Sequence, residues 1–356
     1  MSPRRRLPLL GAAAFAVLFT VPATSAWPVP TGAAVRPRAS ARADTTRDSS
    51  RTDAAVARVH GAATDHVVVI SVDGLRPDAI AKFGARTISR LVREGSATMS
   101  AHTILPSKTL PSHTSMLTGE DVDEHGISWN DNQTHDHGYV RIPTVFALAR
   151  QRGFHTAAFF SKGKFNHLEI PGSLDHAQAP EGNGRWSANR TASDVERYLA
   201  SARPNLLFVH FGEPDYAGHV FGWMSWLYGR NVRKADDGVQ RVLAAADRAF
   251  GVGNYTVILT ADHGGHGRNH GSSDPRDTTI PWITWGKGVQ GATTVADAVR
   301  TMDTAGTALW LLGVTAPEGL AGAPVRGAYT APARTVADAA ASRGVAPSGA
   351  SLAAGY

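Results

Sequence analysis

The sequence of 356 residues contains no cysteine. Disulfide bonds, thiolate metal sites and a cysteine nucleophile are therefore excluded, and the redox compartment cannot be inferred from cysteine usage. The apolar content of 42% is ordinary for a globular protein. A chain of this length can bury a sizeable core in one large α/β domain or in two smaller ones.

Most of the chain also lacks an excess of charge. The formal net charge is +6, but residues 1–60 alone carry nine Arg and no Lys against three Asp. The remaining residues contain 27 basic and 27 acidic side chains. Because this larger part is neutral, we expect no nucleic-acid-binding surface on it.

An apolar run lies near the N-terminus. Arg4, Arg5 and Arg6 precede apolar residues 7–21, and small residues follow as far as Ala26. This order is typical of a secretory signal peptide, and the apolar run is short for a membrane span. We expect residues 1–26 to be a signal peptide and the mature protein to be secreted or extracytoplasmic, without a stable membrane span. An uncleaved membrane anchor is the alternative.

Composition divides the rest of the chain into three parts. Residues 27–63 are rich in Ala, Arg, Thr, Pro and Ser and have little apolar periodicity, which is typical of a disordered linker. Residues 64–330 form the predicted folded domain. Residues 331–356 return to Ala, Pro and Gly and are expected to be a low-complexity tail.

Apolar runs alternate with amphipathic segments in the predicted domain. This alternation predicts an α/β fold with a mostly parallel sheet covered by helices on both faces. Strands are predicted at residues 67–72, 155–160, 205–211, 255–260 and 280–285. Helices are predicted at residues 87–95, 111–117, 144–152, 192–202, 232–250 and 304–312.

Acidic residues and histidines directly follow three of the predicted strands. Each group alone is explained by a turn, a helix cap or a solvated pair. In an open α/β sheet, however, ligands bind beyond the carboxyl ends of the strands, so three such groups predict one shared site. Carboxylates and imidazoles suit divalent cations such as zinc. The residues are Asp73, Asp215 with His219, and Asp262 with His263.

A hydroxyl residue lies at the start of a short predicted helix. Thr109 precedes Pro111, which is expected to open the helix at residues 111–117. The N-terminus of a helix presents free N–H groups and a positive dipole end, which suits attack on a phosphoryl group. Thr109 is therefore the predicted nucleophile of a two-metal hydrolase. The alternative nucleophiles are Ser107, Ser112 and Thr114.

Six motifs occur in a fixed order between residues 66 and 315. They are Val72-Asp73-Gly74-Leu75-Arg76, Lys108-Thr109-Leu110-Pro111-Ser112-His113, Thr118-Gly119, His125-Gly126-Ile127, Asp215 with His219, and Asp262-His263-Gly264. Together they resemble the type I phosphodiesterase/nucleotide pyrophosphatase family of the alkaline phosphatase superfamily.

The resemblance implies a site for two divalent metal ions, with zinc favoured. It implies that Thr109 is the nucleophile and that Asn130 binds a phosphoryl oxygen beside it. One ion would be held by Asp73, Thr109, Asp262 and His263, and the other by Asp215, His219 and a third histidine.

The third histidine departs from the pattern of many relatives, where it lies far downstream. This sequence has no histidine after His270, so the ligand is His270 or His266. We favour His270, because Asn269-His270-Gly271 precedes the strand at residues 280–285 as in compact relatives.

The resemblance implies hydrolysis of phosphodiester or pyrophosphate bonds through a covalent phospho-threonine. The expected partner is a small phosphate ester, nucleotides included. A phosphomonoesterase, a phosphonate hydrolase and a catalytically silent secreted binding module are the alternatives. Lys162 and Lys164 follow the strand at residues 155–160, and we favour solvated roles for them over contact with an anionic substrate.

Overall fold

The computed structural model describes residues 64–330. The predicted signal peptide (1–26), linker (27–63) and tail (331–356) lie outside the described residues, so these assignments stay predictions.

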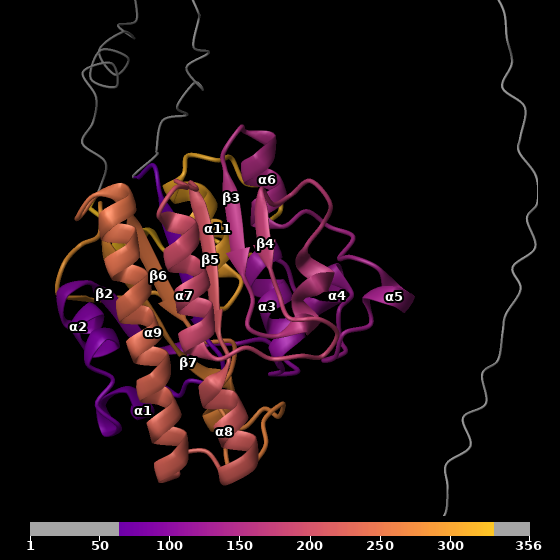
Figure 1. The fold of residues 1–356 in the computed structure, drawn as a ribbon, viewed down its shortest axis with the longest axis vertical. Coiled ribbons are helices and arrows are strands. Elements are labelled where there is room, and N and C mark those ends of the chain that lie inside the picture. The colour runs from indigo at the N-terminus through magenta and orange to yellow at the C-terminus, as the bar shows by residue number, and fades with distance from the viewer. Residues whose placement is uncertain (1–63, 331–356) are drawn as a thin grey trace, which may run out of the picture. The chain divides into compact units, whose positions relative to one another are not determined.

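A single eight-stranded sheet forms the centre of the described residues. In chain order its strands are β1 (Val67–Val72), β2 (Ser96–His102), β3 (Thr156–Phe159), β4 (His176–Gln178), β5 (Leu206–Phe211), β6 (Thr256–Thr260), β7 (Thr279–Gly286) and β8 (Thr293–Thr294). Their order in the sheet is β4-β3-β5-β1-β6-β7-β2-β8 (Figure 1). β7 runs antiparallel to β6 and β2, and the other neighbouring pairs are parallel. The prediction of a mostly parallel sheet is confirmed.

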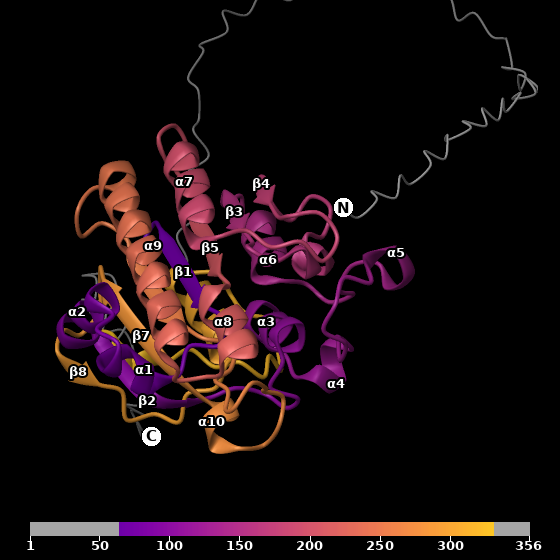
Figure 2. The ribbon, with the colours of Figure 1, turned by 60° about the horizontal axis from the view of Figure 1, so that its bottom comes forward.

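Helices cover both faces of this sheet, as predicted. The α-helices are α1 (Pro77–Lys82), α2 (Arg86–Glu94), α3 (Thr109–Thr118), α4 (Val122–His125), α5 (Thr134–His137), α6 (Val145–Gln151), α7 (Ala188–Leu199), α8 (Glu213–Phe221), α9 (Trp226–Phe250), α10 (Pro275–Thr278) and α11 (Asp303–Leu311). Two short 3₁₀ helices span Gly163–Leu168 and Arg326–Ala328. α7 and α9 pack together over one face, and α3, α6 and α11 pack together over the other (Figure 1, Figure 2).

The central strands explain why one edge of the sheet collects functional residues. Every residue of β1 is buried, because the strand lies between β5 and β6 and its branched side chains fill both faces of the sheet. Val72 pairs with Phe211 of β5, and Ser71 pairs with Thr260 of β6. The three parallel strands therefore end together, and the residues that follow them meet.

The structure also contains elements that the sequence pattern misses. β2 has few branched residues, but it pairs along most of its length with the apolar strand β7, with Ala101 beside Ile280. α9 begins at Trp226, six residues before the predicted helix, because the Ser225 side chain accepts a hydrogen bond from the Tyr228 N–H and caps the helix. Local tertiary partners determine both elements.

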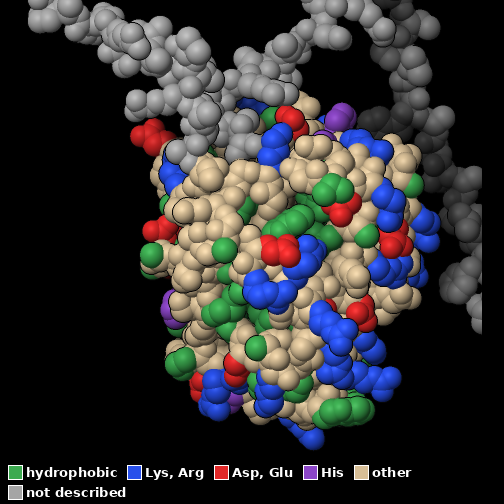
Figure 3. All heavy atoms as spheres, turned by 90° about the vertical axis from the view of Figure 1, so that its left-hand side faces the viewer, with side chains coloured by type: hydrophobic (Ala, Val, Ile, Leu, Met, Phe, Trp, Pro, Cys, Tyr) green, Lys and Arg blue, Asp and Glu red, His purple; other side chains and the backbone are tan. Residues whose placement is uncertain are grey.

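The surface carries charges of both signs. On the face that Figure 3 shows, Lys and Arg side chains mingle with Asp and Glu around a hollow that exposes hydrophobic side chains. Within residues 64–330, no helix combines the length and the apolar character needed to cross a bilayer.

Candidate metal centre

The ends of three neighbouring strands position the acidic residues. Asp73 follows β1 directly, and its N–H donates to the carbonyl oxygen of Phe211 at 2.9 Å. Asp215 lies in the first turn of α8, and its N–H donates to the carbonyl oxygen of Asp73 at 3.0 Å. Asp262 follows β6. These backbone bonds hold carboxylates from distant parts of the chain side by side.

Each of the three carboxylates has one oxygen bound by the protein and one that is not. Lys162 Nζ lies 2.7 Å from Asp73 Oδ2 and 2.6 Å from Asp215 Oδ2, while the Gly74 N–H donates to Asp262 Oδ1 at 3.0 Å. The other oxygens, Asp73 Oδ1, Asp215 Oδ1 and Asp262 Oδ2, are buried and have no hydrogen-bond partner. A buried carboxylate oxygen without a partner is costly unless a cation binds it, so the residues fit a metal.

Three histidines offer a lone pair to this group of oxygens. The Nδ1 atoms of His263 and His270 donate to backbone carbonyl oxygens at 2.8 Å, and Nδ1 of His219 does so at 3.0 Å. Because a carbonyl only accepts, Nδ1 carries the ring proton and Nε2 carries the lone pair. Histidine ligands of metal ions are usually oriented in this way.

His263 lies between two possible metal positions. Its Nε2 is 3.2 Å from Asp262 Oδ2, 3.5 Å from Asp73 Oδ1 and 4.0 Å from Asp215 Oδ1. Candidate ligand atoms of Asp73, Asp262 and His263 lie within 4.8 Å of one another, and so do those of Asp215, His263 and His270. Two ion positions next to each other fit this arrangement.

His219 and His270 complete the second group. His219 Nε2 is 3.3 Å from Asp215 Oδ1, and His270 Nε2 is 3.5 Å from the same oxygen. The two Nε2 atoms are 3.1 Å apart. The structure thus brings together all seven residues predicted to bind metal. The sequence prediction assigns His263 to the first group alone, but in the structure it also lies within reach of the second group.

The other nearby histidines have different partners. His266 Nδ1 is bound to Asp277 Oδ1 at 2.7 Å, and His266 belongs to neither group. Both ring nitrogens of His113 are used, by Ser71 Oγ at 2.7 Å and by a backbone carbonyl at 2.8 Å. The geometry therefore favours His270 over His266 as the third histidine.

Thr109 is the first residue of α3, so the helix begins two residues earlier than predicted. Its buried Oγ1 is 3.3 Å from His263 Nε2. Asn130 holds this end of the helix, because its Oδ1 accepts a hydrogen bond from the Leu110 N–H at 2.9 Å. With Oδ1 in use, the amide nitrogen of Asn130 remains as a donor beside Thr109.

The alternative hydroxyls have partners elsewhere in the protein. Ser107 Oγ donates to the carbonyl oxygen of Ser272 at 2.9 Å, and Thr114 Oγ1 donates to that of Leu110 at 2.8 Å. Ser112 Oγ is 2.9 Å from Thr103 Oγ1. Of the four hydroxyls, Thr109 is the one beside the carboxylates.

Lys162 corrects a prediction. A solvated role is wrong for this residue, because its side chain is buried and bridges Asp73 and Asp215. Burial opposes its charge, but the two carboxylates outweigh that effect and raise the pKa of Lys162. A signal was present in the sequence: Lys162 follows strand β3, whose carboxyl end lies at the same sheet edge.

The carboxylates differ in their ionisation. Burial disfavours the charge on each, yet Lys162 holds the pKa of Asp73 and that of Asp215 below their usual range. The pKa of Asp262 is raised, first by burial and then by the charge of Asp73. Clustered like charges of this kind favour the binding of a cation.

A cavity of about 210 Å³ opens in front of Thr109. Burial and the charge of Lys162 lower the pKa of Lys164, which lines it, to about 8. Its lining includes four of the proposed ligands and several basic or amide side chains: Thr109, Asp215, His219 and His270, with Asn130, Lys162, Lys164, Asn183 and Arg185. Such a lining suits a phosphate group.

Solved structures of other proteins have a similar fold. The chain resembles murine ectonucleotide pyrophosphatase/phosphodiesterase 5, solved as an inactive variant in complex with AMP, with a TM-score of 0.61 and 17% identity over 71% of this chain and 96% of that chain. It also resembles a 2-O GAG sulfatase, with a TM-score of 0.59 and 16% identity over 73% of each chain. The fold is therefore alkaline phosphatase-like.

Curated relatives share more sequence but over a smaller part of their length. GPI ethanolamine phosphate transferase 1 of Aspergillus oryzae is 28% identical over 225 residues, which cover 56% of this chain and 21% of the relative. The human protein of that name is 27% identical over 255 residues, covering 63% of this chain and 26% of the relative. The matched part of the chain thus spans about a fifth to a quarter of these relatives.

These relatives correct the predicted location. The sequence predicts a secreted or extracytoplasmic protein. This prediction is wrong, because the curated relatives that the chain matches are named as GPI ethanolamine phosphate transferases. An apolar N-terminal run indicates entry into a translocation route and not its end point, so the residues alone were insufficient.

The predicted family is confirmed. The profile of the family described as Type I phosphodiesterase / nucleotide pyrophosphatase matches residues 67–273, which include β1, α3, α8 and the proposed ligands. The chain belongs to the type I phosphodiesterase/nucleotide pyrophosphatase family.

Proposed function

We propose that this chain is a two-metal enzyme that hydrolyses phosphodiester or pyrophosphate bonds with Thr109 as nucleophile. The observation that carries the proposal is the set of three buried carboxylate oxygens without partners that lie around His263 Nε2, next to the Thr109 hydroxyl. Membership of a phosphodiesterase family supports the same chemistry.

The metal ligands follow from the two groups of side chains. Asp73, Asp262, His263 and Thr109 would hold one ion, and Asp215, His219 and His270 the other. Nitrogen and carboxylate donors in this number suit zinc. Bound ions of this kind would lower the pKa of the threonine hydroxyl and neutralise charge on the phosphoryl oxygens.

The protein residues then perform a two-step displacement. Thr109 Oγ1 attacks phosphorus, the bond to the leaving alcohol or phosphate breaks, and a phospho-threonine forms. The Asn130 amide and the free N–H groups at the start of α3 hold the phosphoryl oxygens during this step. Water cleaves the phospho-threonine and releases the product.

The names of the relatives suggest a different acceptor for the phosphoryl group in the second step. The curated relatives are named as transferases of ethanolamine phosphate, and in a transferase an alcohol replaces water as the acceptor of the phosphoryl group. Measuring products in the presence of excess ethanol or glycerol separates the two outcomes. Free phosphomonoester alone supports hydrolysis, and a new diester to the added alcohol supports transfer.

The test of the main proposal uses zinc-loaded protein with bis-p-nitrophenyl phosphate and p-nitrophenyl phosphate. We expect about two bound metal ions per chain and faster turnover of the diester. Fewer than one ion per chain under zinc-replete conditions, with no turnover, would instead favour a binding module that keeps the fold without the chemistry.

A specific observation supports a second candidate, a phosphomonoesterase. Lys162, Lys164 and Arg185 line the cavity in front of Thr109, and a monoester dianion carries more charge for them to bind than a diester does. If this candidate is right, Lys164→Ala lowers kcat/KM for p-nitrophenyl phosphate by about tenfold and changes the diester value much less.

A further inference from the structure

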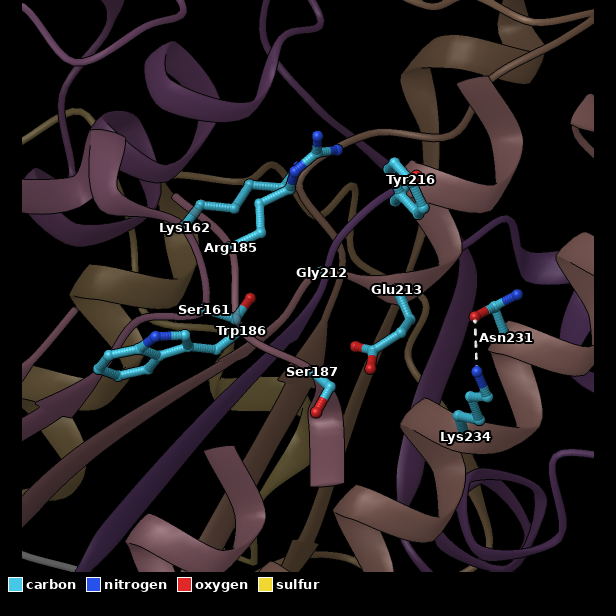
Figure 4. A pocket seen from close by; sticks show the side chains of 10 residues that line it. All are labelled: Ser161, Lys162, Arg185, Trp186, Ser187, Gly212, Glu213, Tyr216, Asn231 and Lys234. Atoms are coloured by element: carbon cyan, nitrogen blue, oxygen red, sulfur yellow. Dashed lines mark hydrogen bonds between the residues drawn. The ribbon is translucent and has the colours of Figure 1, made fainter. Parts of the chain in front are cut away.

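A second cavity of about 350 Å³ lies beside the proposed catalytic cavity (Figure 4). It shares Lys162 and Arg185 with that cavity, so the two cavities adjoin at these side chains. The volume is in the range of small-molecule sites. Its other walls come from Ser161, Trp186, Ser187, Gly212, Glu213, Tyr216, Asn231 and Lys234.

Glu213 supplies the most informative group in this second cavity. One carboxylate oxygen accepts a hydrogen bond from the Ala188 N–H at the start of α7. The other, Oε2, is buried and has no partner. In Figure 4 the Glu213 carboxylate points toward Ser187 and Trp186, and the pair formed by Asn231 and Lys234 lies on the other side of the Glu213 side chain. Oε2 is therefore a hydrogen-bond acceptor without a donor.

The neighbouring cationic side chains have hydrogen-bond donors that lack an acceptor. Lys234 Nζ, whose side chain is exposed, is 3.5 Å from Asn231 Oδ1, a long contact that leaves its other protons free. The guanidinium of Arg185 lies over the ring of Tyr216 at 4.4 Å. These cations need an acceptor, so the cavity presents donors and one strong acceptor to the same ligand.

These demands select among ligand chemistries. An ammonium group donates but cannot accept, and it would meet the positive charges of Arg185 and Lys234. A phosphate dianion accepts but cannot donate to Glu213. A nucleobase stacks on an open aromatic face, and here Arg185 covers one face of Tyr216 and Arg190 covers one face of Trp186 at 4.5 Å, which leaves at most one face of each ring for stacking. Hydroxyl groups both donate and accept.

We propose that this second cavity binds the polyhydroxylated alcohol part of the substrate, a sugar or cyclitol esterified to the phosphate that Thr109 attacks. Glu213 Oε2 would accept hydrogen bonds from ring hydroxyls, and Lys234 and Arg185 would donate to them. The inference rests on the proposed function, because it places the reacting phosphate at Thr109.

The kinetic test compares diesters that share a p-nitrophenolate leaving group. One carries methyl glucoside on phosphorus, one ethanol, one ethanolamine and one thymidine. We expect kcat/KM for the glucoside diester to exceed that for the ethyl diester at least tenfold, and this ratio to fall roughly tenfold in Glu213→Gln and in Lys234→Ala. Gln at position 213 keeps an acceptor for the Ala188 N–H, and Lys234 is exposed, so both variants should fold. The exposed Glu318→Gln is the matched control and should leave the ratio unchanged.

A binding measurement separates this inference from the proposed function. Saturation-transfer NMR of methyl glucoside with zinc-loaded Thr109→Ala protein should detect binding, and adding Glu213→Gln should abolish it. Binding without turnover of any diester would support the second cavity and overturn the proposed reaction. Turnover without glucoside preference and without glucoside binding would overturn the second cavity, as would a preference for the ethanolamine or thymidine diester that Glu213→Gln reduces.

Discussion

The partner of each ring nitrogen separates the candidate ligands from the other histidines at the site. His219, His263 and His270 donate from Nδ1 to backbone carbonyl oxygens, which leaves Nε2 for a metal. Both nitrogens of His210 are used, by Ser161 Oγ at 2.7 Å and by Asp73 Oδ2 at 2.9 Å. With both nitrogens in use, His210 would orient the proposed ligand Asp73 rather than bind metal itself.

The role of Thr109 can be tested by Thr109→Ala. This change removes the attacking oxygen and one possible metal contact but leaves the carboxylates and imidazoles in place. We expect turnover to fall on the order of 10⁴-fold, with a modest loss of metal and an unchanged fold. Ser112→Ala is the control, because that hydroxyl contacts Thr103 instead. Near-normal activity of Thr109→Ala would show that another group is the nucleophile.

The third histidine can be assigned by comparing His270→Ala with His266→Ala. Loss of His270 removes a direct ligand, so zinc affinity should fall at least about 100-fold, and excess zinc should partly restore activity. Loss of His266 should have a small effect, because its partner Asp277 keeps its bonds to Ser272. Competition with a chromogenic chelator measures both. The reverse pattern would assign the site to His266.

At the scale of elements, the sequence predicts the strands that form the site better than the strands at the far end of the sheet. β1, β5 and β6 are continuous apolar runs, so their ends, and the residues that follow, are identifiable from sequence alone. β2 and the two-residue β8 have no such pattern and form through pairing. Lys162 was misjudged for a related reason: a lysine is solvated unless the fold brings carboxylates to it.

The turn between β1 and α1 contains a glycine that the site requires. Gly74 has φ +70°, and a Cβ there would lie 2.9 Å from the Asp215 Cα atom, while the Gly74 N–H binds Asp262. We expect Gly74→Ala to weaken metal binding and to destabilise the protein by about 3 kcal/mol or more, since backbone atoms must move.

Gly84 provides a matched control for this glycine. Its φ is +66°, but a Cβ there would meet nothing within 4 Å. Gly84→Ala should therefore cost only about 1 kcal/mol of backbone strain and leave metal affinity intact. Urea unfolding and zinc titration distinguish the two variants. Equal losses of stability and zinc affinity in both variants would mean that the close contact between residue 74 and Asp215 has no effect.

At the scale of the whole molecule, we expect metal binding and folding to be coupled. Three buried carboxylates meet beyond the carboxyl ends of the central strands, and Lys162 compensates only part of their charge. An ion present at about 1,000 times its Kd adds roughly 4 kcal/mol of stability, which for a domain of this size is about 8–16 °C in Tm.

Removal of metal should therefore lower Tm by about 8–16 °C. Differential scanning calorimetry with and without a chelator measures the shift, and Asp215→Asn should reduce it because one ligand oxygen loses its charge. Thr109→Ala should keep most of it. A Tm that does not respond to chelation would contradict a structural contribution from the ions.

The short segment between β6 and α10 carries two proposed ligands, His263 and His270, and its Arg268 carbonyl orients a third, His219. Residues 267–269 are exposed at its tip, where backbone bonds between His266 and Asn269 close a turn. Arg268 is therefore an exposed trypsin cleavage site beside the candidate metal centre. Ions held by His263 and His270, which flank Arg268 in the sequence, would hold this segment in place and slow its cleavage, so the rate of nicking at Arg268 would report on occupancy of the site without any substrate.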